Sequence, residues 1–326
     1  MDQPAHTPHP PRTHQPARPP TPVPAPAAHQ PARSPAPAQP AARPHPRPGT
    51  TATPPAPAPA SYVHGYSGQE AKRLGDQADT LAALLHAGTA YPAGSRVLEV
   101  GCGVGAQTVH LVAGSPGARI VAVDHSAASL AQARERVRGQ APGAAVQWCR
   151  ADLFALPFPD ASFDHVFVCF VLEHLRAPQR ALAGLRRVLR PGGTLTVIEG
   201  DHGSAFFHPD GAAARAAVGH LVSLQAAGGG NALLGRALQP LLTAAGYAGV
   251  TVHPRTVYAD ATRPHLMAGF TRNTFIPMVA AVRDEALTSG LTTAADWDRG
   301  LAELHRTAEP GGTFHYTFFK ATAVRE

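Results

Sequence analysis

From residue 96 onward the chain alternates short apolar runs with longer segments in which apolar residues recur every three or four positions. Short apolar runs predict buried strands, and the longer period predicts amphipathic helices. Strands that alternate with helices at short intervals are typical of a parallel sheet with helices on both faces, so the predicted fold class is α/β. The predicted strands lie within 96–100, 118–126, 145–158, 163–175, 190–200, 249–260 and 312–324.

Helical spacing is clearest in the segment 62–88, where an amphipathic helix is predicted to lead into the sheet. Ser126 follows the second predicted strand and stands where a helix N-cap is expected. The long segments 203–246 and 263–307 exceed what simple connections need, so we expect them to form an added helical lid. Further helices are predicted near 106–113, 128–138, 177–189, 211–227 and 233–245.

The stretch VLEVGCGVGAQT, residues 97–108, predicts a buried strand, a glycine turn and the start of a helix. Gly101, Gly103 and Gly105 let the backbone turn sharply and approach a ligand without a Cβ in the way. Glu99 then stands at the carboxyl end of the strand, where open α/β sheets bind their ligands. The same turn, with Asp124 about 20 residues on, also satisfies a looser dinucleotide pattern, so a nicotinamide-dependent oxidoreductase stays open at this point.

The first 60 residues differ in composition from the rest of the chain. They hold 21 of the 34 prolines, five arginines and one aspartate, which is +4 of the formal net charge of +6. Such a segment buries too little apolar surface to offset the entropy of ordering it, so 1–60 is predicted to be a disordered Pro/Ala/His-rich tail and 61–326 one domain. A scaffold protein whose proline-rich tail recruits partners is therefore a non-enzymatic alternative.

Charge and cysteine usage exclude several other classes. Five arginines spread over 60 residues make no dense basic patch, and residues 61–326 carry only about +2, so no nucleic-acid partner is expected. Cys102, Cys149 and Cys169 lack the CxxC spacing of a zinc site and suit reduced thiols in a cytoplasmic protein, with no metal. No apolar run reaches the length of a membrane span.

Several further motifs follow the glycine turn in order: VAVDHS, ADLFALPF, FDHVFVCFVLEHL and RPGG. In this order and spacing, residues 62–200 resemble the class I S-adenosylmethionine-dependent methyltransferases, above all the ubiquinone and menaquinone C-methyltransferase branch. The resemblance implies a Rossmann-like, mostly parallel seven-stranded sheet with an antiparallel last strand. It also implies S-adenosyl-L-methionine as the methyl donor and a small molecule as the acceptor.

The same resemblance suggests which residues hold the donor. Glu99 and the glycine turn would receive the methionine part, where a carboxylate can bind the ammonium group. Asp124 would accept hydrogen bonds from the ribose hydroxyls, and Phe170 would lie beside the sulfonium. His125, Asp152 and Leu153 would lie at the adenine. The full set implied for the donor is Glu99, Gly101, Gly103, Gly105, Gln107, Asp124, His125, Asp152, Leu153 and Phe170.

The sequence defines the acceptor site and any catalytic base less clearly than the donor site. His202, in the segment 199–209 that is expected to form a loop after the fifth strand, is the leading candidate for a base, with Asp201 to orient it or to bind substrate. His174 in the LEHL motif is a weaker candidate. Tyr62, His64 and Tyr66 precede the sheet and are expected to line the acceptor pocket. The acceptor atom (O, N or C) and the oligomeric state stay open.

Overall fold

The computed structural model describes residues 68–326. The predicted tail 1–60 and the predicted substrate residues Tyr62, His64 and Tyr66 lie outside the described residues.

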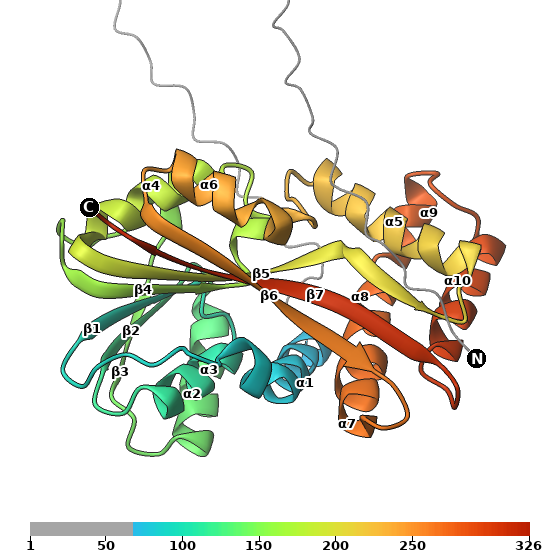
Figure 1. Ribbon diagram of the computed structural model, residues 1–326, viewed down its shortest axis with the longest axis horizontal. Coiled ribbons are helices and arrows are strands. Elements are labelled where there is room, and N and C mark those ends of the chain that lie inside the picture. The colour runs from blue at the N-terminus through green and yellow to red at the C-terminus, as the bar shows by residue number, and fades with distance from the viewer. Residues whose placement is uncertain (1–67) are drawn as a thin grey trace, which may run out of the picture. The chain divides into compact units, whose positions relative to one another are not determined.

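The strands form one sheet in the order β3-β2-β1-β4-β5-β7-β6 (Figure 1). The pairs β1–β2, β2–β3, β1–β4 and β4–β5 are parallel, whereas β7 is antiparallel to both β5 and β6. The predicted Rossmann-like sheet with an antiparallel last strand is therefore confirmed. The strands are β1 (Arg96–Val100), β2 (Arg119–Asp124), β3 (Val146–Arg150), β4 (Phe163–Cys169), β5 (Leu189–His208), β6 (Ala248–Ala259) and β7 (Thr313–Val324).

Helices cover both faces of the parallel part of the sheet, because successive strand residues point to opposite sides. Val97 of β1 belongs to the core formed with α1 and α2, and its neighbour Leu98 belongs to the core formed with α4 and α6. Ser126 caps α3 by accepting a hydrogen bond from the Ser129 N–H at 3.1 Å, as predicted. These helices are α1 (Gly68–Leu85), α2 (Ala106–Gly114), α3 (Ala127–Gln140), α4 (Pro178–Val188) and α6 (Leu238–Ala244).

The remaining helices lie along the second half of β5 and the first half of β7 (Figure 1). Phe270, Phe275 and Trp297 from these helices share one core with Phe314 and Tyr316 of β7. The helical content of the predicted lid segments is thus present, and their action as a lid stays a prediction. The elements are α5 (Ala212–Ala227), α7 (Pro264–Leu266), the π-helix η4 (Met267–Phe275), α8 (Ile276–Ala280), α9 (Arg283–Thr288) and α10 (Ala294–Arg306), with short 3₁₀ turns η1 (Leu153–Ala155), η2 (Leu172–His174) and η3 (Leu234–Ala237).

Strand β5 is much longer than predicted. The segment 199–208, expected to be a loop, continues the strand and pairs with the first half of β7. The pairing is interrupted once, because Asp201 faces Thr317 whereas the next paired residue, Phe206, faces His315. The intervening residues form an irregularity that holds His202, and such bulges redirect side chains near functional sites.

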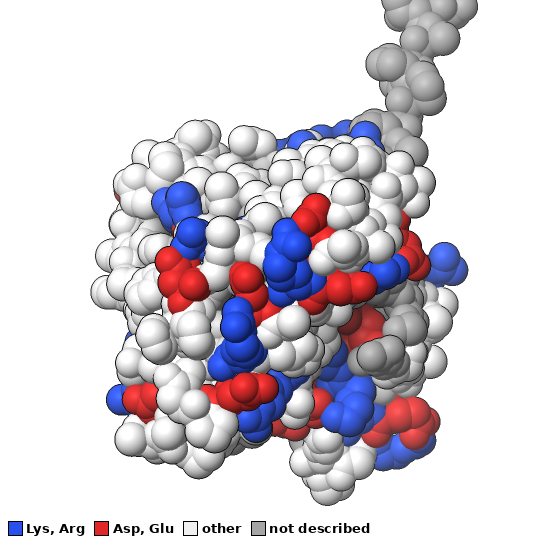
Figure 2. Space-filling view, turned by 90° about the vertical axis from the view of Figure 1, so that its right-hand side faces the viewer, with Lys and Arg blue, Asp and Glu red and all other residues white. Residues whose placement is uncertain are grey.

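One face of the described part is mixed in charge. On the face shown in Figure 2, basic and acidic side chains are interspersed and neither sign forms a continuous patch. Among residues 68–326, no helix is both long enough and apolar enough to cross a bilayer.

Candidate active site

The glycine turn lies between the end of β1 and the start of α2. Gly101, Gly103 and Gly105 all have positive φ angles, of 65°, 52° and 75°, which explains why glycine stands at each. A Cβ on Gly101 would lie 2.6 Å from Val171 Cγ2, and one on Gly105 would lie 2.9 Å from Ala133. A Cβ on Gly103 would meet nothing within 4 Å. The turn is therefore closely packed at Gly101 and Gly105 and open at Gly103.

Asp124 ends β2 beside this turn. Its Oδ2 accepts a hydrogen bond from the Gly103 N–H at 2.9 Å, and its Oδ1 accepts one from the Ser126 N–H at 2.8 Å. The side chain is largely buried. Because each carboxylate oxygen has two acceptor positions, Asp124 keeps acceptor capacity after both bonds are made.

Glu99 points from β1 into the interior next to Asp124. Burial raises its pKa from 4.5 to about 7, and the charge of Asp124 adds to the rise. Its Oε2 is buried and receives no hydrogen bond from the described part of the chain. A buried carboxylate oxygen without a donor is an unsatisfied acceptor, and a cationic group placed there would complete it.

The predicted adenine-side residues follow the ends of β2 and β3. His125 is exposed, with Nδ1 3.4 Å from Asp124 Oδ1. Asp152 is exposed and caps η1 by accepting from the Phe154 N–H at 2.9 Å, with Leu153 as the next residue. Gln107 instead contacts His86, since its Oε1 lies 2.8 Å from His86 Nε2.

Phe170 follows β4 directly and has a positive φ of 58°, an uncommon conformation for a non-glycine residue. Its N–H donates to the Ile198 carbonyl at 2.9 Å, which holds the strained backbone against β5. Its ring lies 5.4 Å from that of Phe318 on β7. The end of β4 thus presents an aromatic side chain between the glycine turn and β7.

His202 and Tyr316 form a buried polar pair on the far side of this aromatic group. The Nδ1 of His202 lies 2.7 Å from the hydroxyl oxygen of Tyr316. Burial lowers the pKa of His202 from 6.5 to about 3 and raises that of Tyr316 well above its usual value. Both side chains are therefore neutral at pH 7.

Asp201 does not orient His202, although it was expected to do so or to bind substrate. Adjacent strand residues point to opposite faces, so the two side chains diverge. Both carboxylate oxygens of Asp201 accept from Arg236, at 2.6 and 2.7 Å, and Oδ1 also accepts from the Gly203 N–H. In this structure Asp201 is thus part of an ion pair that ties η3 to β5.

A second buried carboxylate cluster follows β4. The Oε1 of Glu199 accepts from the N–H groups of Val171 and Leu172 at 3.2 and 2.8 Å, so Glu199 caps the start of η2. Glu173 is buried within η2, and burial raises its pKa to about 7. Glu173 was not predicted although it precedes His174 in the LEHL motif, because no local pattern indicates that its side chain turns inward.

Helix α1 brings a charged group to the same region. Arg73 is buried, pairs with both oxygens of Glu70 at 2.6 and 2.7 Å, and donates to Gln77. Burial lowers the pKa of His174 and of His202, and the charge of Arg73 lowers both further. The same charge opposes the rise in the pKa of Glu173. His174 Nε2 lies 3.6 Å from Glu173 Oε1. The effect of the Arg73 charge on Glu173, His174 and His202 shows that α1 lies near η2 and β5.

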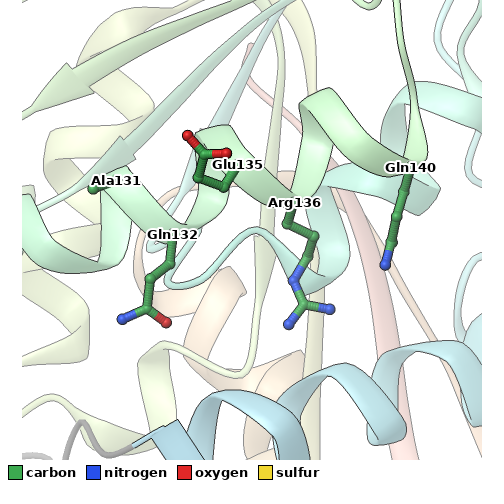
Figure 3. A pocket seen from close by; sticks show the side chains of 5 residues that line it. All are labelled: Ala131, Gln132, Glu135, Arg136 and Gln140. Atoms are coloured by element: carbon green, nitrogen blue, oxygen red, sulfur yellow. The ribbon is translucent and has the colours of Figure 1, made fainter.

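A surface hollow beside α3 lies at a different place (Figure 3). It is lined by Ala131, Gln132, Glu135, Arg136 and Gln140. The Arg136 side chain points toward α1, where its Nη2 donates to the Ala71 carbonyl at 3.3 Å and its Nε to the Val104 carbonyl at 3.1 Å. Arg136 therefore holds α1 against the back of the glycine turn.

Comparisons with known proteins agree with this arrangement. Residues 98–197 match the family model described as a methyltransferase domain. An uncharacterized 37.1 kDa protein in transposon TN4556 of Streptomyces fradiae is 36% identical over 200 residues, which covers 58% of this chain and 56% of that protein. The demethylmenaquinone methyltransferase of Thermus thermophilus is 39% identical over 104 residues, which covers 32% of this chain and 46% of that protein.

The chain thus spans about half the length of these relatives. Among solved structures, the YcgJ protein of Bacillus subtilis superposes with a TM-score of 0.49 at 15% identity, over 76% of this chain and 98% of that chain. The sequence matches favour a methyltransferase over the nicotinamide-dependent oxidoreductase that the glycine turn alone left open. Residues 98–197 of this chain are thus similar to the methyltransferase domain of these enzymes.

Proposed function

We propose that this protein binds S-adenosylmethionine at the glycine turn and transfers its methyl group to a small-molecule acceptor. The observation that carries the proposal is the bond between Asp124 and the Gly103 N–H, beside open space at Gly103. A carboxylate fixed there keeps acceptor positions for a pair of ribose hydroxyls. The open glycine lets a ligand approach the backbone closely.

The residues around the turn fit the two charged ends of that ligand. The unsatisfied Oε2 of Glu99 would accept from the ammonium of the methionine part, directly or through water. When bound, S-adenosylmethionine supplies a methyl group on a positively charged sulfur. Phe170 would lie beside this charge, since aromatic faces attract cations.

At the other end, His125 would flank the adenine, Asp152 would accept from its amino group, and the Leu153 N–H would donate to the ring. The exposure of His125 and Asp152 beside the ends of β2 and β3 supports this assignment. Gln107 would support the site indirectly through His86.

On the acceptor side, we propose that His202 holds the acceptor as a neutral hydrogen-bonding group. A pKa of about 3 makes its imidazole a poor proton acceptor at neutral pH, so we do not assign it proton removal. Asp201 would not contact the acceptor and would support β5 through its ion pair with Arg236. His174, Tyr62, His64 and Tyr66 stay proposed neighbours of the acceptor.

The proposal includes a cytoplasmic location and no nucleic-acid partner. The unpaired Cys102, Cys149 and Cys169 support the first part, because reduced thiols are typical of that compartment. The mixed charges of the face in Figure 2 support the second.

The proposal is tested by calorimetric titration of the full chain with S-adenosylmethionine and, in parallel, with NADH. We expect saturable binding of the former only. Asp124→Ala removes the ribose acceptor and should weaken binding at least about tenfold, since hydrogen bonds to charged groups contribute about 1.5–3 kcal/mol each. Asp284→Asn, at a side chain that is 96% exposed, is the matched control. Preferential NADH binding would overturn the proposal.

A further inference from the structure

One carboxylate oxygen in this region has no hydrogen-bond partner among the contacts described so far. The Oε2 of Glu173 is buried and accepts no hydrogen bond from any described residue. Glu199, its neighbour across the cluster, differs because backbone N–H groups of η2 bind both of its oxygens. An unsatisfied buried acceptor destabilises a fold, so its presence indicates a group that completes it in the working enzyme.

The backbone of Glu173 is held firmly, so its side chain has a defined direction. Its carbonyl accepts from the Asn231 N–H at 2.7 Å and from Gln225 Nε2 at 3.1 Å. The charged and titratable groups around its carboxyl come from four elements: Arg73 of α1, His174 of η2, Glu199 of β5 and Tyr316 of β7. The carboxyl therefore faces the interior that these elements enclose.

The position of η2 relates this interior to the donor site. Val171, two residues before Glu173, packs against the back of Gly101. Phe170, one residue earlier, faces Phe318 of β7. Glu173 thus belongs to the short turn that lies between the glycine turn and the His202–Tyr316 pair. The acceptor must occupy the same region if its reactive atom is to reach the methyl group.

We propose that Glu173 Oε2 contacts the acceptor and removes its proton. This inference rests on the proposed function. The reactive atom of the acceptor bonds to the methyl carbon as the carbon–sulfur bond breaks, and the electron pair of that bond stays on sulfur, which becomes neutral. The hydrogen on the reactive atom leaves as a proton to the Glu173 carboxylate. The acceptor class is thus a small molecule that carries a hydrogen on its methylated atom, which excludes thioethers and tertiary amines.

The chemistry of the two candidate bases supports this choice. The Nδ1 of His202 is already bonded to Tyr316, and burial holds the pKa of its imidazole at about 3. Burial raises the pKa of Glu173 to about 7, close to neutral pH, where a general base works best.

The protonation of Glu173 is tested first, in the free protein and without any acceptor. Infrared difference spectra of wild type against Glu173→Gln should contain the band of a protonated carboxyl group at pH 6 that disappears as the pH is raised to 8. Glu309→Gln, at an exposed carboxyl, should leave that band in place. A Glu173 that is already ionised at pH 5 would overturn the proposal.

Proton removal is tested with CD3-labelled S-adenosylmethionine and two acceptor mixtures, one of phenols and secondary amines and one of thioethers and tertiary amines. Labelled products should come only from the first mixture. Glu173→Gln should lower kcat by about 100-fold or more while the Kd for S-adenosylmethionine stays within about twofold. Glu173→Asp should recover part of kcat, with a shifted pH profile.

Transfer only to the second mixture, or full activity of Glu173→Gln, would overturn the role of Glu173. Failure of the wild-type chain to bind S-adenosylmethionine in calorimetry would instead overturn the proposed function, so the two failures are distinguishable.

Discussion

The Nδ1 of His202 lies 2.7 Å from the hydroxyl oxygen of Tyr316, and this contact joins β5 to β7 at the point where their pairing register shifts. Both side chains are buried and neutral at pH 7. The irregularity in β5 therefore holds an imidazole inside the molecule, where it makes a neutral hydrogen bond with Tyr316.

Removal of the Tyr316 hydroxyl should destabilise the fold. Tyr316→Phe keeps the ring but leaves His202 Nδ1 buried without its partner, so we expect the free energy of unfolding to fall by about 1–3 kcal/mol in urea denaturation. Tyr258→Phe, at a ring that is 42% exposed, is the control. Equal stability of the two variants would contradict the importance of the bond.

The pH dependence of stability should reveal the buried neutral imidazole. The native pKa of His202, about 3, lies below its ordinary 6.5, so the unfolded chain binds the proton first as the pH falls. The contribution is complete above pH 6.5 and is lost as the pH falls toward 3. The stability of wild type relative to His202→Asn should therefore drop by up to about 1.4 kcal/mol per pH unit below 6.5. A constant difference between pH 7 and pH 4.5 would refute this.

Two glycines of the same turn should respond differently to alanine. Gly101→Ala places a Cβ 2.6 Å from Val171 in a backbone with φ of 65°, so stability should fall by more than the roughly 1–2 kcal/mol cost of the left-handed conformation alone. Gly103→Ala meets open space and should stay close to that cost, yet weaken S-adenosylmethionine binding at least about tenfold. Thermal unfolding and calorimetry measure the two effects, and unchanged affinity in Gly103→Ala would count against the proposed binding site.

Glu99 should make donor binding depend on pH. Its pKa is about 7 in the free protein, and a bound ammonium favours the ionised form, so a proton must leave on binding at lower pH. Affinity for S-adenosylmethionine should rise by up to about tenfold per unit from pH 6 to 7 and then level off. Glu99→Gln should bind more weakly and without this dependence, whereas Glu135→Gln, on the surface, should keep it. A Glu99→Gln variant with the wild-type pH profile would exclude the contact.

The pair of Asp201 and Arg236 should matter more than an ordinary surface ion pair. The Asp201 side chain is 3% exposed, so Arg236→Met leaves a buried carboxylate that has lost two charged hydrogen bonds. We expect the free energy of unfolding to fall by about 1–3 kcal/mol. Arg299→Met, which breaks a pair exposed on both sides, should change it by less than about 0.5 kcal/mol. Similar losses in both variants would show that the burial of Asp201 is unimportant.

Local patterns predicted most of the parallel half of the sheet. The bounds of β1, the start of α2 and the cap at Ser126 agree with expectation, because burial period and capping act over a few residues. The extension of β5 through 199–208 was missed because its hydrogen-bond partner, β7, lies more than 100 residues later. Only pairing with β7 makes the segment a strand.

The amino-acid sequence by itself determined that a glycine turn follows a buried strand, with Glu99 and Asp124 at neighbouring strand ends. These features depend on backbone conformation and on the alternation of buried and exposed positions, both of which are local. Only the tertiary structure decided that Asp201 pairs with Arg236, that His202 bonds to Tyr316, and that Glu173 turns inward with its Oε2 unsatisfied by any described residue. Those outcomes depend on side-chain direction and on contacts between distant segments, which no local period encodes.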